Sequence, residues 1–174
     1  AWSCREEFTE QTAFGSLSDE SLKNKQGVEL LLVGAYSALD GLIDSPESEW
    51  SKTGDNWWFD ALSDDAHKGS NDGDQPPLTQ LEAYTWDAGN EYFLGKWKAL
   101  YAGVNRANAV INQINLVEGE ELTQQLAEAR FLRGYFYFEL QKIFGNPAYI
   151  SEENFKNLEF NQPNTGPVWA QIEA

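Results

Sequence analysis

The sequence has very little of several residue types on which common protein functions depend. Of its 174 residues, one is cysteine, one is histidine and none is methionine. A single cysteine cannot form an internal disulfide, and one cysteine with one histidine cannot build a structural zinc site. Because even an initiator methionine is missing, we expect a processed product or a piece excised from a longer chain. No apolar run approaches the ~20 residues that a membrane-spanning helix needs.

Basic residues are also scarce. Twelve Lys and Arg residues stand against 28 Asp and Glu residues, so the formal net charge is −16 at pH 7. This charge repels phosphate backbones and anionic lipid surfaces, which argues against nucleic-acid binding and against membrane attachment through a basic patch. Hydrophobic material is present instead. The 41% of apolar and 14% of aromatic residues argue against a disordered chain and suffice for one domain with a buried core.

Three stretches repeat their apolar residues with the period of an amphipathic helix. Residues 16–43 carry such a pattern, with Ser18 as the expected N-cap. A second helix is predicted over 90–117 and a third over 120–144, ended by the Gly-Asn-Pro sequence at 145–147. The middle of the third helix is apolar almost all round, which predicts neighbours on several sides. Strand patterns are nearly absent, so the predicted fold class is all-α, with antiparallel helix pairs of tetratricopeptide type.

Residues 44–88 interrupt the helical rhythm. They are rich in Gly, Pro, Ser, Asn and Asp, which are the residues of turns and loops. Large aromatic residues lie among them, namely Trp50, Trp57, Trp58, Phe59, Tyr84 and Trp86. So many rings argue against disorder, and a loop of this length is uncommon unless it has a function. We therefore expect an inserted loop that forms a ligand face.

Several motifs, taken in chain order, resemble those of one family. The stretch AEARFLRGYFYFELQKIFG at 127–145 is similar to the long-helix signature of the SusD/RagB family of Bacteroidetes outer-membrane lipoproteins. The resemblance runs from Cys4 to Ala174 and so covers the whole chain. Its other elements are Glu29-Leu30-Leu31 with Gly34-Ala35-Tyr36, Leu62-Ser63-Asp64-Asp65-Ala66, Trp97, Tyr101, Asn105 with Ala107-Asn108-Ala109, and Trp169-Ala170-Gln171-Ile172-Glu173.

The resemblance implies a non-enzymatic nutrient-binding lipoprotein that is anchored in the outer membrane and faces the cell exterior. Members of this family have four tetratricopeptide-like helix pairs that support an irregular ligand-binding half. They bind glycans, or peptides in some members, and pass them to a TonB-dependent transporter of the SusC type. This chain would be the N-terminal part of such a protein. It would comprise a tether at 1–15 and a helical region at 16–174 that includes the 44–88 loop.

Cys4 has the position of a lipoprotein's acylated cysteine, in front of which the signal peptide is cut. The following Arg5-Glu6-Glu7 resembles the basic-then-acidic tract of surface-exported lipoproteins in the same bacteria. Lipidation of Cys4 would supply the anchor, because two or more acyl chains hold a protein stably in a membrane. An unpaired, exposed thiol near a frayed terminus is the alternative.

The 44–88 loop holds the candidate ligand-binding residues. A sugar presents flat C–H faces edged with hydroxyls, so its receptor needs aromatic rings and short hydrogen-bonding side chains. The rings would come from Trp57 and Trp58, for which attachment of the loop to the helices is the alternative role. The polar candidates are His67, Ser70, Asn71 and Asp72. In the resembled family this stretch often carries an aromatic ring, which this chain lacks, so polar contacts or a different ligand are implied.

Catalytic and metal-binding patterns are weak. Asp64 and Asp65 are adjacent rather than placed across a bond, and a helix cap at Ser63 or Asp64 suits them better. Residues 71–74 resemble a calcium loop but lack its later bidentate glutamate. We therefore expect no catalytic residue, no metal and no cofactor. Two rival interpretations are a helical-repeat adaptor for protein partners and a fragment of an α-helical glycoside hydrolase.

Overall fold

The computed structural model describes residues 21–41, 63, 65–69, 71, 73–157 and 166–174. All regular secondary structure in these residues is helical, which confirms the predicted all-α class. None of the described helices is long and apolar enough to cross a membrane. The elements are α1 (Lys25–Ser37), the 3₁₀ helix η2 (Ala38–Asp40), α3 (Pro76–Glu82), α4 (Glu91–Ile114), α5 (Thr123–Phe144) and α6 (Trp169–Ile172).

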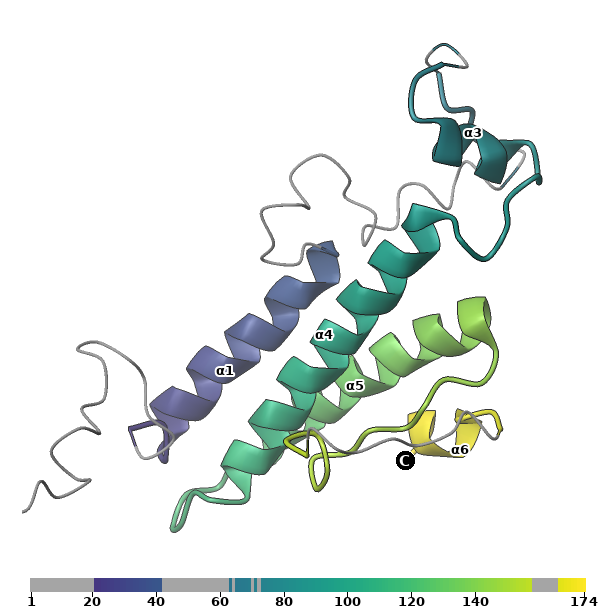
Figure 1. The fold of residues 1–174 in the computed structure, drawn as a ribbon. Helices are drawn as coiled ribbons and strands as arrows, with labels where there is room; N and C mark the ends of the chain where they lie inside the picture. The colour runs from purple at the N-terminus through teal and green to yellow at the C-terminus, as the bar shows by residue number, and fades with distance from the viewer. Residues whose placement is uncertain (1–20, 42–62, 64, 70, 72, 158–165) are drawn as a thin grey trace, which may run out of the picture.

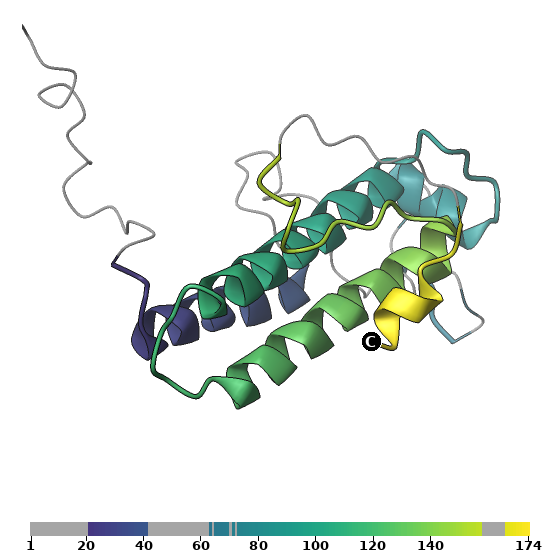
Figure 2. The same ribbon diagram turned by 90° about the horizontal axis from the view of Figure 1, so that it is seen from below.

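Three long helices, α1, α4 and α5, pack side by side and form the body of the molecule (Figure 1). α4 runs in the opposite direction to both α1 and α5, and a short turn joins it to α5. α6 lies against α5 near the C-terminus (Figure 2). α3 lies at the end of the bundle where α4 begins. This end therefore collects segments from the region that the sequence predicts to be the ligand face.

α1 begins later than the sequence pattern predicts. Residues 21–24 form a turn, and Asn24 Oδ1 accepts a hydrogen bond of 2.9 Å from the backbone N–H of Gly27. The cap of α1 is therefore Asn24 and not Ser18, which lies outside the described residues. The turn passes so close that a Cβ atom on Gly27 would lie 2.3 Å from the backbone oxygen of Leu22. Close approach of the backbone, rather than a break in the helix, explains this glycine.

The two longer helices lie where the sequence predicts them. α4 begins one residue later and ends three residues earlier than predicted, and α5 begins three residues later and ends at the predicted residue. Asn90 caps α4 by accepting a hydrogen bond of 3.0 Å from the backbone N–H of Tyr92. α5 ends at Phe144, and the C-cap residue Gly145 has a φ of 79°, a conformation that glycine tolerates. The region predicted as one long loop also contains a short helix, α3, whose first two residues are Pro76 and Pro77. Proline suits a first helical turn because no N–H is needed there.

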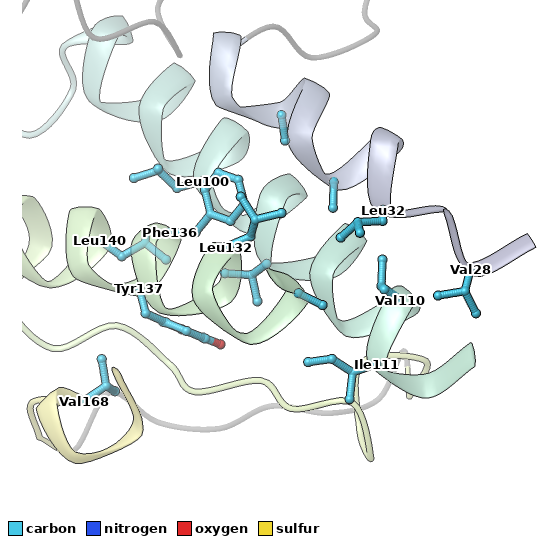
Figure 3. Packing of buried hydrophobic residues seen from close by; sticks show 14 of the residues in the cluster. Val28, Leu32, Leu100, Val110, Ile111, Leu132, Phe136, Tyr137, Leu140 and Val168 are labelled. Carbon is cyan, nitrogen blue, oxygen red and sulfur yellow. The ribbon is translucent and has the colours of Figure 1, made fainter. Parts of the chain in front are cut away.

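The main core lies between α1, α4 and α5. Its buried side chains include Val28 and Leu32 of α1, Leu100, Val110 and Ile111 of α4, and Leu132, Phe136, Tyr137 and Leu140 of α5 (Figure 3). A smaller cluster of Leu78, Leu81 and Tyr92 fixes α3 on the start of α4. Burial of these apolar surfaces contributes roughly 25 cal/mol per Å² and is the main force that joins the helices.

α1, α4 and α6 pack around α5, as predicted for a helix with neighbours on several sides, but part of a second face is exposed. Phe136 and Tyr137 are buried, but Phe131 is 73% exposed and Phe138 is 40% exposed. Within the described residues, the apolar pattern of the second face therefore lacks a packing partner along part of its length. α6 packs on part of this second face, where the rings of Phe138 and Trp169 lie 6.1 Å apart.

The segment that follows α5 folds back along the two long helices. The Tyr101 hydroxyl donates a hydrogen bond of 2.8 Å to the backbone oxygen of Ala148. Asn108 Nδ2 donates one of 2.9 Å to the backbone oxygen of Ile150. The Tyr137 hydroxyl bonds both the oxygen and the N–H of Ile150, at 3.0 and 2.6 Å. We call residues 145–157 the return segment.

These buried phenols predict a loss of stability in alkali. Burial raises the pKa of Tyr101 to about 12, and it also raises the pKa of Tyr137. Because the unfolded phenol titrates near pH 10, the resulting stabilisation is complete below that pH and is lost as the pH rises towards 12. Denaturant titrations between pH 8 and 11.5 should show this decline, and it should be shallower in Tyr101→Phe. An unchanged slope in Tyr101→Phe would contradict the assignment.

Candidate ligand-binding surface

The predicted site residues that the structure describes lie at the α3 end of the bundle. His67 and Asn71 belong to a polar loop, defined by the described residues 65–69, 71 and 73–75, which leads into α3. The other predicted residues lie outside the described part of the chain. These are Cys4, Trp57, Trp58, Ser70 and Asp72.

Lys68 organises the polar loop. Its ammonium group donates to the backbone oxygens of Asn71 and Asp74, at 2.8 and 2.5 Å, and to the hydroxyl of Thr79 at 2.5 Å. The Asn71 side chain accepts a hydrogen bond of 3.1 Å from the N–H of Gly73, which tightens the same turn. The tract that resembles a calcium loop in sequence is therefore closed around the ammonium group of Lys68. Among the described residues, no group of three or more His, Cys, Asp or Glu side chains is placed to hold a metal ion.

The His67 side chain contacts Glu82, the last residue of α3. Its Nδ1 contacts the Glu82 carboxylate, while most of the imidazole ring stays exposed. Ser63 does not cap a helix, because its hydroxyl accepts a hydrogen bond of 3.2 Å from Asp65 N–H in a non-helical turn. The predicted helix cap at Ser63 is therefore wrong, and the alternative cap, Asp64, lies outside the described residues. The polar loop instead presents an exposed imidazole beside an ordered turn.

A row of aromatic rings begins beside this loop. Tyr84 is 64% exposed, and its ring lies 5.3 Å from that of Trp86, which in turn lies 6.1 Å from that of Phe93. Tyr84 has a φ of 55°, a left-handed conformation that is uncommon outside glycine and belongs to the turn that ends α3. Only Ala83 separates Tyr84 from Glu82, which His67 contacts. Polar and aromatic groups therefore share one end of the molecule.

Behind Trp86 the surface is hollowed by a cavity of about 430 Å³. We call it the Trp86 cavity. It lies where the turn before α4, the start of α4 and the end of α5 meet. Its lining residues are Trp86, Asp87, Ala88, Phe93, Ile143 and Phe144.

Spacing along the chain does not single out this cavity. Tyr84 and Trp86 lie in the predicted long loop, where no role is predicted for them, and the α5 residues belong to a helix predicted to pack against its neighbours. One signal does point to the cavity. Tyr84 and Trp86 lie six and four residues before Asn90, the cap of α4, so both rings are expected near the end of the bundle where α4 begins. The contribution of Ile143 and Phe144 depends on how α5 crosses α4, which spacing along the chain does not encode.

Comparison with known proteins identifies the family. A family model for SusD-like proteins, described as starch-binding associating with outer membrane, matches residues 15–173. The chain belongs to the SusD-like family. A SusD-like protein of Bacteroides ovatus is 32% identical over 85 residues, which cover 46% of this chain and 15% of that relative. The family resemblance seen in the sequence is thereby confirmed.

Proposed function

We propose that this SusD-like chain binds glycans at the outer membrane without catalysis and passes them to a TonB-dependent transporter of the SusC type. The observation that carries the proposal is the match of almost the whole chain to a family described as starch-binding and associated with the outer membrane. Lipidation of Cys4 would anchor the protein with its ligand face outward. Tethering beside the transporter would raise the effective concentration of the bound glycan, so each contact can be weak.

The end of the bundle has the groups that this function needs. The exposed Tyr84 ring offers a flat apolar surface for the C–H face of a sugar. The exposed His67 ring and the ordered turn around Lys68 lie beside it and can bond sugar hydroxyls. We place Ser70, Asn71 and Asp72 in the same surface, together with Trp57 and Trp58, on the strength of their position in the sequence. Peptide binding at this surface is the alternative within the family.

Affinity electrophoresis with soluble starch, β-glucan and mannan tests the proposal. Tyr84→Ala is expected to weaken binding to the recognised glycan about tenfold, because the ring supplies stacking area. His67→Ala should weaken it about threefold, as expected for one hydrogen bond. Phe131→Ala is a matched control, since it removes another exposed ring from the far face of α5.

Two outcomes would contradict this assignment. Loss of binding in Phe131→Ala as large as in Tyr84→Ala would mean that the effect is not local. Binding to peptides and to no polysaccharide would favour the alternative ligand class.

Two further measurements test the remaining residues. Unchanged binding in a variant that lacks Trp57 and Trp58 would assign those two rings to packing. Mass spectrometry of the native protein would show whether Cys4 is acylated.

A further inference from the structure

We propose that the Trp86 cavity is a subsite for a single neutral sugar ring, which deepens the glycan-binding function proposed above. Its volume of about 430 Å³ lies in the range of ~300–1,000 Å³ that is typical of small-molecule sites. It is separate from the polar loop, because none of the loop's residues lines it. A glycan chain that crosses Tyr84 would reach the cavity at the neighbouring ring of Trp86.

The walls of the cavity suit the apolar face of a sugar. Trp86 is 37% exposed, so part of its indole is open to a ligand, while Phe93, Ile143 and Phe144 form the remaining wall. The indole lies in contact with rings on both sides, tilted by 46° to Tyr84 and by 66° to Phe93. Its neighbours therefore hold it in place before a ligand arrives, which lowers the entropic cost of binding.

Asp87 gives the cavity a hydrogen-bonding rim. Its Oδ1 accepts a hydrogen bond of 2.7 Å from the N–H of Gly89, which fixes the orientation of the carboxylate. An ionised carboxylate has about four acceptor positions, so it can accept two further hydrogen bonds. Adjacent hydroxyls of a sugar ring are paired donors at the spacing that such a group binds well, and hydrogen bonds to a charged acceptor are the stronger kind.

The charge of this rim selects the ligand class. Among the described residues that line the cavity, Asp87 is the one ionisable side chain, and none of them is Lys or Arg. The whole chain carries a net charge of −16. A sugar with a carboxylate or sulfate group would meet like charge with no cation to offset it. The cavity is therefore suited to neutral sugars and rejects acidic ones.

The test measures binding of the full chain to neutral and acidic polysaccharides by calorimetry or affinity electrophoresis. Soluble starch, β-glucan and mannan are the neutral probes, and polygalacturonate is the acidic one. Trp86→Ala should weaken binding to the recognised neutral glycan about tenfold, while Trp86→Phe should lose less because a ring remains. Asp87→Asn retains an oxygen that can accept from Gly89, so the turn is preserved. It should weaken neutral binding about threefold and reduce the preference over polygalacturonate.

The control is Phe138→Ala, which removes a partly exposed ring that lines a different hollow on α5. It should bind like the parent chain. Parental affinity in both Trp86→Ala and Asp87→Asn would overturn the subsite and leave the glycan-binding function standing. Tighter binding of polygalacturonate than of every neutral glycan would overturn the ligand class. Absence of binding to all four polysaccharides would overturn the subsite and the proposed function together.

Discussion

Gly103→Ala is expected to lower the free energy of unfolding by about 3 kcal/mol, the upper end of the usual cost of overpacking a core. Gly103 lies on α4 where it faces α5, and an added Cβ would lie 2.5–2.7 Å from three ring carbons of Phe136. Phe136 is 1% exposed and packed on all sides, so its ring cannot turn away. The two helices would have to separate. Chemical denaturation monitored by circular dichroism measures the change.

Gly34→Ala provides the matched control. Gly34 is also helical, but no atom lies within 4 Å of the position that its Cβ would take. The same chemical change should therefore stabilise the protein by up to about 1 kcal/mol, because alanine favours a helix more than glycine does. A second variant, Gly103→Ala with Phe136→Leu, should recover part of the loss by making room. Equal effects of alanine at positions 103 and 34 would show that α4 and α5 do not approach as closely as described.

Arg133→Met is expected to lower the free energy of unfolding by about 2–3 kcal/mol, the size of a lost hydrogen bond to a charged group. The Arg133 guanidinium on α5 contacts the Glu152 carboxylate of the return segment and donates a hydrogen bond of 3.0 Å to Asn108 Oδ1. Asn108 is fully buried, so its amide oxygen would lose a partner with no water to replace it. Arg106→Met is a control on a partly exposed arginine and should cost less than about 1 kcal/mol.

The same contact predicts how stability depends on acid. Burial raises the pKa of the Glu152 carboxyl, but hydrogen bonds from its own backbone amide and from Arg133 outweigh burial and lower the pKa below its ordinary value of 4.5. A lowered pKa stabilises the fold above pH 4.5, and this stabilisation is lost as the pH falls through the folded-state value. The decline of unfolding free energy below pH 5 should therefore be shallower in Arg133→Met. Parallel pH profiles for the two proteins would contradict this origin.

The sequence predicts the long helices well and their contacts poorly. The helices α4 and α5 carry more than five turns of apolar spacing each, and such long patterns leave little choice of conformation. The start of α1 was missed because a turn at 21–24, held by Leu22 and Asn24, competes locally with the helix. The exposed side of α5 could not be predicted from the sequence. An apolar residue such as Phe131 indicates that a helix face can be buried, but it does not show whether another element packs against that face.

The sequence selects the region of the proposed ligand surface rather than its individual residues. The described part of the 44–88 region, with His67 and Asn71, lies at the α3 end of the bundle, where we propose that the ligand binds. Spacing does not reveal that Lys68 closes the loop, because its three acceptors include two backbone oxygens, which every residue possesses. The Trp86 cavity depends on Phe93 of α4 and on Ile143 and Phe144 of α5, which lie about fifty residues apart in the chain. Tertiary crossing, not local pattern, brings them together.

The return segment has a consequence for how this protein can diverge in evolution. Tyr101, Asn108 and Tyr137 hold the return segment by hydrogen bonds to main-chain atoms of Ala148 and Ile150. These hydrogen bonds do not depend on which side chains stand at positions 148 and 150. Substitutions at 148 and 150 can therefore accumulate while the path of the chain is kept. The three helical residues cannot be replaced as freely, because their side chains make these hydrogen bonds. Sequence changes in the return segment should therefore be tolerated only where Tyr101, Asn108 and Tyr137 are retained.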